Sequence, residues 1–376
     1  MNAKKLSVIL FFVLLFLLPI LTFVLPKKTF SESENRVLTT MPAPTLDNIT
    51  DKKFMNGFEG YFSDHFVLRD QWIAAKTQVE LAAGKKEIGG VFLTKDRMME
   101  DVSKPDQTLV DKNLAAIKTY ADRHSSVSVL LAPTSAEIYK DELPPNAPVL
   151  DQSAWIASAY EKLGANAHPI DAVSALHKAK NKEIYYRTDH HWTSLGAFTA
   201  YQASGDVLGF TPLSASAFEV ERASDQFLGT LYSKTLYNGI GKDSIDLYHY
   251  QDDNAVSEVV VNAGSKKSSY QSIYFRDFLD KKDKYSVFLG SNQPVVTVKT
   301  GNKNGKKLLI FKDSYAHCYA QFLIPHYEEI ALVDLRYING SYEKYLESSD
   351  YDQTLFLYNV STFTTDNSIQ KLALAQ

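Results

Sequence analysis

An aspartate, two histidines and a tryptophan lie side by side in the stretch TDHHWT. Asp189 and His191 are two positions apart, so in an extended stretch their side chains project to the same side. The carboxylate of Asp189 could then accept a hydrogen bond from Nδ1–H of His191, while Nε2 faces a hydroxyl group that it deprotonates. In the same geometry His190 faces the other way and is the weaker candidate. The spacing therefore predicts an orienting acid and a base that need a nucleophile from elsewhere in the chain.

Two other interpretations of this motif have to be weighed. Aspartate and histidine are good ligands for metal ions. Adjacent residues rarely reach one ion together, however, and no His-x3-His pair or carboxylate cluster follows nearby in the sequence. The other interpretation is a surface loop whose Thr193 or Ser194 caps the next helix. We predict no metal at this motif and no cofactor.

A candidate nucleophile lies far downstream. In KKLLIFKDSYAHCYAQF an apolar strand ends at Ser314 and a helix begins directly after it. Open α/β sheets bind ligands at the carboxyl ends of their strands, and N–H groups at the start of the next helix would face an oxyanion. A serine at this position also suits a helix cap. The G-x-S-x-G elbow of the α/β-hydrolases is absent.

Three further residues are candidates for oxyanion or substrate contacts. Asn359 ends the apolar run LFLYN, where its amide could donate to an oxyanion or form part of a turn. Arg187 flanks the histidine motif and could line a substrate groove, and Tyr315 follows the candidate nucleophile. His317, three residues after Ser314, is interpreted as a packing or surface residue.

Strands and helices alternate from about residue 88 onward. This alternation implies an α/β fold with a central, mostly parallel sheet covered by helices on both faces. The Ser-, Asp- and Lys-rich stretch at about 203–300 is less regular, and we interpret it as an insertion within the domain. Strands are predicted at 126–133, 306–314, 329–337 and 351–360, and helices at 152–164 and 171–180.

The N-terminal segment predicts a membrane anchor. Leu6–Leu25 carries no charge, and twenty helical residues span roughly 30 Å, the thickness of the hydrocarbon core of a bilayer. No A-x-A cleavage pattern follows, which favours an uncleaved anchor over a cleaved signal peptide. We therefore expect residues 1–26 to form a single-pass anchor, residues 27–87 a tether and helical region, and residues 88–376 a domain outside the cytoplasm.

Composition narrows the class of partner. The net charge is −4, and the lysines and arginines are scattered, so nothing indicates nucleic-acid binding. Cys318 is the single cysteine, which excludes an intrachain disulfide and leaves stability to a full-sized core.

The combination of TDHHWT with a strand-terminal KDSY resembles the DHHW proteins. These are similar to the alginate O-acetylation proteins of the AlgX and AlgJ type, which have SGNH-hydrolase-like domains. The segments SENRVLTTMP, FEGYFSDHFVLRD and GVFLTKD extend the resemblance over most of the chain beyond the anchor. The resemblance implies a three-layer SGNH-like sandwich with a circularly permuted motif order, because the acid and base precede the serine. The segment Lys312-Asp313-Ser314 departs from the glycine-bearing serine motif that is usual in these proteins.

By resemblance, Ser314 is the nucleophile, His191 the base and Asp189 the orienting carboxylate, with Asn359 as a possible oxyanion donor. The implied activity is O-acetylation of hydroxyls of a cell-wall or secreted polysaccharide, with a multispanning membrane-bound O-acyltransferase supplying the acetyl group. The alternatives are an acetylesterase that uses the same residues with water as acceptor, and a silent glycan-binding or assembly protein.

Overall fold

The computed structural model describes residues 3–34, 36–100, 102, 104–250, 256–264 and 266–375. The chain forms two compact units. The smaller unit comprises Met1–Gly89 and Tyr232–Gly239, and the larger comprises Gly90–Leu231 and Ile240–Gln376. The expected boundary at residues 87 and 88 lies beside the division at 89 and 90.

The larger unit is built on one eight-stranded sheet. Its strand order is β11-β10-β12-β14-β13-β15-β6-β7. The five strands from β14 to β7 run parallel, while β12, β10 and β11 form an antiparallel edge. The sheet is thus mixed and mostly parallel. The strands are β6 (Val127–Ala132), β7 (Ala167–Pro169), β10 (Val256–Asn262), β11 (Lys267–Tyr270), β12 (Val295–Thr300), β13 (Lys307–Lys312), β14 (Glu329–Val333) and β15 (Gln353–Asn359).

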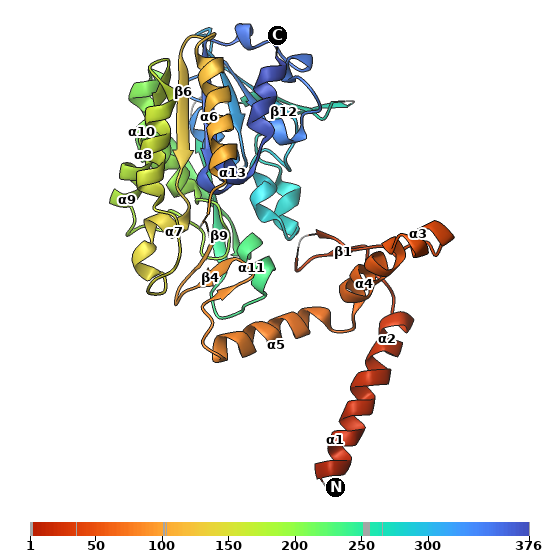
Figure 1. Ribbon diagram of the computed structural model, residues 1–376. Helices are drawn as coiled ribbons and strands as arrows, with labels where there is room; N and C mark the ends of the chain where they lie inside the picture. Colours follow the sequence, from red (N-terminus) through yellow and green to blue (C-terminus); the bar gives the residue numbers. More distant parts are fainter. Residues whose placement is uncertain are drawn as a thin grey trace. The chain divides into compact units, whose positions relative to one another are not determined.

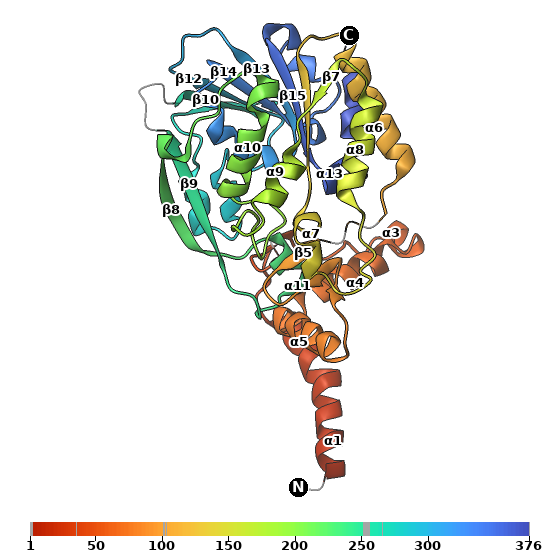
Figure 2. The ribbon, with the colours of Figure 1, turned by 90° about the vertical axis from the view of Figure 1, so that its left-hand side faces the viewer.

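Helices cover both faces of this sheet (Figures 1 and 2). Side chains of a strand alternate between its faces, and β6 shows the result. Its Val127, Val129 and Leu131 belong to one buried cluster, while Leu130 and Ala132 belong to the other. The first face is covered by α6 (Gln107–Ala121), α8 (Gln152–Leu163) and α13 (Val360–Thr365), and the second by α9 (Ala172–Lys178), α10 (Ser194–Leu208) and α12 (Tyr315–Tyr319).

The stretch at about 203–300, which we expected to be irregular, contains much regular structure. Strands β8 (Phe218–Phe227) and β9 (Asp243–Tyr250) form an antiparallel pair. Strands β10, β11 and β12 then complete the edge of the central sheet. Runs such as VSEVVVN and VVTVKT are rich in β-branched residues, which suit strands, but the serines and lysines around them obscure the pattern.

The smaller unit begins with a continuous apolar helix over Ala3–Val24, long enough to cross a membrane. It consists of α1 (Ala3–Phe12), a π-helical turn at Val13–Leu17 and α2 (Leu18–Val24). Further on, α4 (Lys53–His65) and α5 (Arg69–Ala82) are separate helices, because Leu68 between them adopts a left-handed backbone conformation with φ of 58°.

The chain also contains several short strands and helices. Strands β4 (Val91–Leu93) and β5 (Met98–Glu100) form an antiparallel hairpin. Among the described residues, the remaining strands and α-helices are β1 (Phe30–Ser31), β2 (Arg36–Val37), α3 (Leu46–Thr50), β3 (Glu87–Ile88), α7 (Ser135–Ile138) and α11 (Thr230–Thr235), and short 3-10 helices lie between several elements.

Candidate active site

Ser314 lies at the carboxyl end of β13, between that strand and α12. Strand β13 has parallel neighbours on both sides, so the serine lies in the middle of the edge where α/β folds place their sites. The apolar run Leu308–Phe311 is completely buried and fixes the strand. The sheet therefore presents Ser314 from a rigid element.

The histidine motif lies on a loop that bends back on itself. Tyr185 and Trp192 form an isolated antiparallel bridge, and the Tyr186 N–H donates to the His191 carbonyl at 3.3 Å. Trp192 is fully buried, and its indole N–H donates to the Tyr315 carbonyl at 3.1 Å. This bond ties the loop to α12 directly after Ser314. Packing of Trp192 thus brings the two distant segments together.

Asp189, His191 and Ser314 form one hydrogen-bonded series. His191 Nδ1 lies 2.6 Å from Asp189 Oδ1, and His191 Nε2 lies 2.7 Å from Ser314 Oγ. Asp189 is 1% exposed and His191 is 5% exposed. Because a carboxylate only accepts, Nδ1 carries the hydrogen and Nε2 accepts the hydroxyl hydrogen of Ser314. This tautomer can remove the proton from Ser314.

The charge states of Asp189 and His191 suit the removal of a proton from Ser314. Burial by itself would raise the pKa of Asp189, but the charges of His191 and His190 and hydrogen bonds from His191 and Thr230 hold that pKa well below its usual range. Burial, together with the charge of His190, lowers the pKa of His191 to about 4, although Asp189 acts in the opposite direction. At neutral pH the carboxylate is charged and the imidazole is a neutral proton acceptor.

The second oxygen of Asp189 is held by Thr230, a residue that the sequence analysis did not identify. The Thr230 N–H and hydroxyl donate to Asp189 Oδ2 at 2.7 and 2.9 Å. A Cβ added to the adjacent Gly229 would lie only 2.3 Å from the same oxygen. Gly229 thus lets the chain approach the carboxylate closely. Nothing in the letters of FLGTLY marks these two residues.

The expectation that His190 faces away from the pair is wrong. Its ring lies 3.9 Å from the ring of His191, and its Nδ1 lies 2.6 Å from Thr230 Oγ1. The extended geometry assumed from the sequence fails because the loop turns back, so both rings come to one side. Since the Thr230 hydroxyl donates to Asp189, it accepts from His190.

Tyr285 and Asp243 also support the loop and were missed from the sequence. The Tyr285 ring stacks on His191 at 3.7 Å, and its hydroxyl donates to the Ser314 carbonyl at 3.1 Å. Asp243 accepts from the N–H groups of Arg187 and Thr188, at 2.8 and 2.9 Å, and from the Thr188 hydroxyl. Both residues come from the stretch at 203–300 that we expected to be an irregular insertion.

Asn359 is not placed to stabilise an oxyanion, which corrects that expectation. Its amide donates to Asp313 Oδ2 at 2.7 Å and to Thr362 Oγ1 at 2.9 Å, so both of its N–H groups are engaged. Its Oδ1 accepts from the Thr362 N–H and caps α13. Asp313 in turn accepts from the N–H groups of Tyr315 and Asn359, so it orders the ends of β13 and β15.

Arg187 and Tyr315 serve the loop in different ways. The Arg187 side chain is exposed and pairs with Glu183, while its N–H and carbonyl are bound by Asp243 and Met98. Tyr315 is fully buried, and its hydroxyl donates to the His190 carbonyl. Tyr315 therefore positions the loop, and Arg187 is the one of the two whose side chain is accessible.

His317, expected to be a packing or surface residue, is buried below the serine. Its Nε2 accepts from Lys312 Nζ at 2.6 Å, and Lys312 also reaches Asp334 at 3.2 Å. Asp334 is held by Arg336. Lys312, His317 and Asp334 thus form a buried polar cluster that links α12 to the ends of β13 and β14.

The atoms of Asp189, His190 and His191 that could bind a metal lie within 4.8 Å of one another. Both ring nitrogens of His191 already face partners, Asp189 on one side and Ser314 on the other. Binding an ion through this ring would break one of these bonds. The donor set thus fits acid–base chemistry better than metal coordination.

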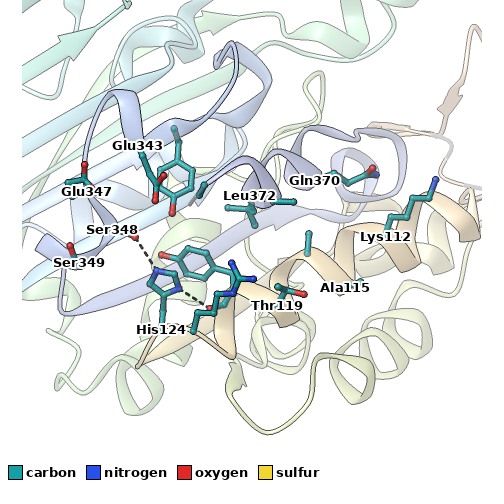
Figure 3. Close-up of a pocket in the computed structure, with 16 residues that line it drawn as sticks. Lys112, Ala115, Thr119, His124, Glu343, Glu347, Ser348, Ser349, Gln370 and Leu372 are labelled. Carbon is teal, nitrogen blue, oxygen red and sulfur yellow. Dashed lines mark hydrogen bonds between the residues drawn. The ribbon is translucent and has the colours of Figure 1, made fainter.

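A hollow of about 660 Å³ lies elsewhere in the larger unit (Figure 3). It is lined by residues of α6, by Arg123 and His124 after that helix and by the segments 342–349 and 370–375, and none of the three residues of the series borders it. Its lining includes His124, which is hydrogen-bonded to Ser348 at 3.1 Å.

Comparisons with known proteins agree with this architecture. Residues 82–333 match a family described as DHHW protein. The solved structure of a DHHW family protein from Eubacterium siraeum superposes with a TM-score of 0.65 and 26% identity, covering 76% of this chain and 95% of that one. Bacillus cereus PatB1 superposes with a TM-score of 0.63 and 17% identity, covering 74% and 98%, and shares the fold.

One relative whose name states an activity matches a shorter part of the chain. The chain is 29% identical over 146 residues to the probable alginate O-acetylase AlgJ of Pseudomonas putida. The match covers 37% of this chain and 32% of that protein, so the chain spans about a third of the length of this relative.

Proposed function

The chain belongs to the DHHW protein family, and from this premise we propose that it transfers acetyl groups to hydroxyls of a cell-wall or secreted polysaccharide. The observation that carries the proposal is the hydrogen-bonded series Asp189–His191–Ser314, with contacts of 2.6 and 2.7 Å. The similarity to a probable alginate O-acetylase supports acetyl as the transferred group and polysaccharide as the acceptor class.

The first half of the reaction acylates Ser314. Its Oγ attacks the carbonyl carbon of an acetyl donor while its proton passes to His191 Nε2. The charged Asp189 stabilises the imidazolium that forms. His191 then gives the proton to the departing group of the donor, and the acetyl ester of Ser314 remains.

The second half regenerates the serine. A sugar hydroxyl attacks the acetyl carbonyl, its proton passes to His191 Nε2, and the tetrahedral intermediate collapses. The bond to Ser314 Oγ breaks, and His191 returns the proton to that oxygen. The products are an O-acetylated sugar and the free enzyme. If water replaced the sugar hydroxyl, the same steps would release acetate.

The proposed location rests on the N-terminal helix. We take the helix Ala3–Val24 as an uncleaved anchor, and because only a short tail precedes it, we place the larger unit outside the cytoplasmic membrane. Acetyl-CoA is absent there, so a membrane-bound O-acyltransferase must pass the acetyl group across. The proposed partners are therefore this donor protein and the polysaccharide.

A fluorophosphonate probe tests the serine chemistry. The wild-type chain should be labelled, the Ser314→Ala variant should lose the label, and His191→Gln should be labelled far more slowly. Ser286→Ala is the matched serine control. Ser286 is also buried, but its hydroxyl donates to Asp283 and not to a histidine, so this variant should keep the label. A wild-type chain without label would favour a silent glycan-binding protein.

A further inference from the structure

The last turn of the apolar helix is in contact with a later part of the smaller unit. Phe23, one residue before the end of α2, stacks with Phe58 at 6.3 Å and lies 5.9 Å from the ring of Phe62. One residue earlier, Thr22 is completely buried, and its hydroxyl accepts from the Val67 N–H at 3.1 Å. These contacts place α4 at the level where the apolar helix ends.

Helix α4 and Phe66, the residue directly after it, carry a row of aromatic rings along one face. Phe54, Phe58, Phe62 and Phe66 recur every four residues, with successive ring centroids 6.0, 6.3 and 5.5 Å apart. All four are half-buried rather than enclosed. Met55 beside this row is 59% exposed. A stripe of this kind buries its apolar side against something else.

The position of the row identifies what covers it. If Leu6–Leu25 crosses the hydrocarbon core, Phe23 lies at the boundary between hydrocarbon and headgroups. Any ring stacked on Phe23 must lie at that boundary too. The next charged residues of the chain, Lys27 and Lys28, mark the start of the polar region. The face formed by the four phenylalanines thus lies at the depth where lipid is the available partner.

Trp72 extends the same boundary into α5. Its side chain is 45% exposed, and its indole N–H donates to the Val67 carbonyl at 3.1 Å. Val67 is itself bound to Thr22 in the last turn of the apolar helix. Tryptophan is enriched at membrane–water interfaces, where its ring combines an apolar body with a polar N–H. Leu68, next to Val67, is 56% exposed.

We propose that α4, together with Leu68 and Trp72, lies in the interface of the bilayer as a second membrane contact beside the anchor. The inference rests on the anchor in the proposed function. Two attachments on one membrane surface restrict rotation of the tether and hold it close to the bilayer. The occupant of the aromatic face is the lipid surface itself.

Brominated lipids test the inference on the full chain. The protein is reconstituted in phosphatidylcholine vesicles that contain phosphatidylcholine brominated near the top of its acyl chains, which quenches tryptophan on contact. Of the three tryptophans, Trp192 is fully buried and Trp155 packs on Phe363 within the larger unit. Quenching should therefore come from Trp72 and disappear in Trp72→Phe. Equal quenching of both chains, or none in either, would overturn the proposal.

A pair of adjacent substitutions tests the orientation of α4. In the Trp72→Phe background, Met55→Trp places a reporter beside the aromatic row, and Asn56→Trp places one on the opposite side of the helix, about 100° further round. Both positions are exposed, so both variants should fold. Met55→Trp should be quenched strongly and Asn56→Trp weakly, whereas equal quenching would contradict the proposed face.

An alkaline wash separates failure of the anchor from failure of the interface. A chain that stays with the vesicles but shows no Trp72 quenching keeps its anchor and refutes the interfacial helix, leaving the aromatic face to a protein partner. A chain released by the wash refutes the anchor, and the interfacial helix with it. Neither result touches the chemistry of Ser314, which the fluorophosphonate probe reports independently.

Discussion

At the scale of single residues, Thr230 controls the carboxylate on which the acid–base series depends. Its hydroxyl donates to Asp189 and accepts from His190. Thr230→Val keeps the shape and the backbone N–H but removes this link. A hydrogen bond to a charged group contributes about 1.5–3 kcal/mol, so we expect acetyl transfer to fall by roughly tenfold or more. Thr230→Ser keeps the hydroxyl and should keep the rate of acetyl transfer near that of the wild type. A Thr230→Ser variant as slow as Thr230→Val would show that the loss comes from packing.

The close approach of Gly229 to Asp189 leaves no room for a side chain at position 229. Alanine at this position would put a Cβ 2.3 Å from the carboxylate oxygen, so Asp189 must move. Because a misplacement of about 1 Å can cost on the order of a hundredfold in rate, Gly229→Ala should be nearly inactive while its circular dichroism stays that of a folded chain. Gly241→Ala is the matched control, since a Cβ there meets nothing within 4 Å. A fully active Gly229→Ala would contradict the role given to Asp189.

The pH dependence of the reaction follows from His191. Its pKa is lowered to about 4, and the reaction needs the neutral ring. Protonation therefore removes the base only as the pH falls through about 4. We expect the rate of serine acylation with an artificial acetyl ester to be flat from pH 7 down to about pH 5 and to fall below that. An inflection near pH 6.5, the usual value for histidine, would show that the ring is not buried as described.

At the scale of elements, the site depends on parts of the chain with very different sequence signals. Strands β13 and β15 were predictable because each is a run of buried apolar residues. The stretch from β8 to β12 was not, since strands such as β8 and β11 are largely exposed and interrupted by polar residues. Yet this stretch supplies Gly229, Thr230, Asp243 and Tyr285 to the site. Their contacts join positions far apart in the chain, and no local pattern encodes such contacts.

Asp243, the first residue of β9, makes the stability of the chain depend on pH. Burial raises its pKa to about 6, from a usual value near 3.8. Because the pKa of Asp243 is higher in the folded chain than in the unfolded chain, its contribution to the free energy of unfolding is complete below the pKa of the unfolded chain. This contribution is lost as the pH rises through the pKa of the folded chain. The free energy of unfolding of the wild-type chain, minus that of Asp243→Asn, should therefore shrink as the pH rises from about 4 to about 7. Urea denaturation at each pH measures this difference in free energy. A difference that grows with pH would contradict the raised pKa of Asp243.

At the scale of the whole molecule, the chain combines an apolar helix with an α/β unit that carries the candidate site. That Asp189, His191 and Ser314 lie together could be predicted from the sequence, because the first two share a motif, the third ends a strand and the combination resembles the DHHW proteins. The side on which His190 lies could not, because it depends on how Tyr185 and Trp192 close the loop. The role of Asn359 was also beyond sequence, since a strand-end amide can cap a helix as readily as it can bind an oxyanion.

Following an acetyl group through Ser314 tests the proposed reaction itself. The chain is incubated with an artificial acetyl ester, and its peptides are analysed by mass spectrometry before and after a candidate polysaccharide is added. We expect acetylation of Ser314, dependent on His191, followed by loss of that acetyl group and its appearance on the polysaccharide. Transfer that persists in Ser314→Ala, or a wild-type chain that is never acetylated on Ser314, would contradict the proposed reaction.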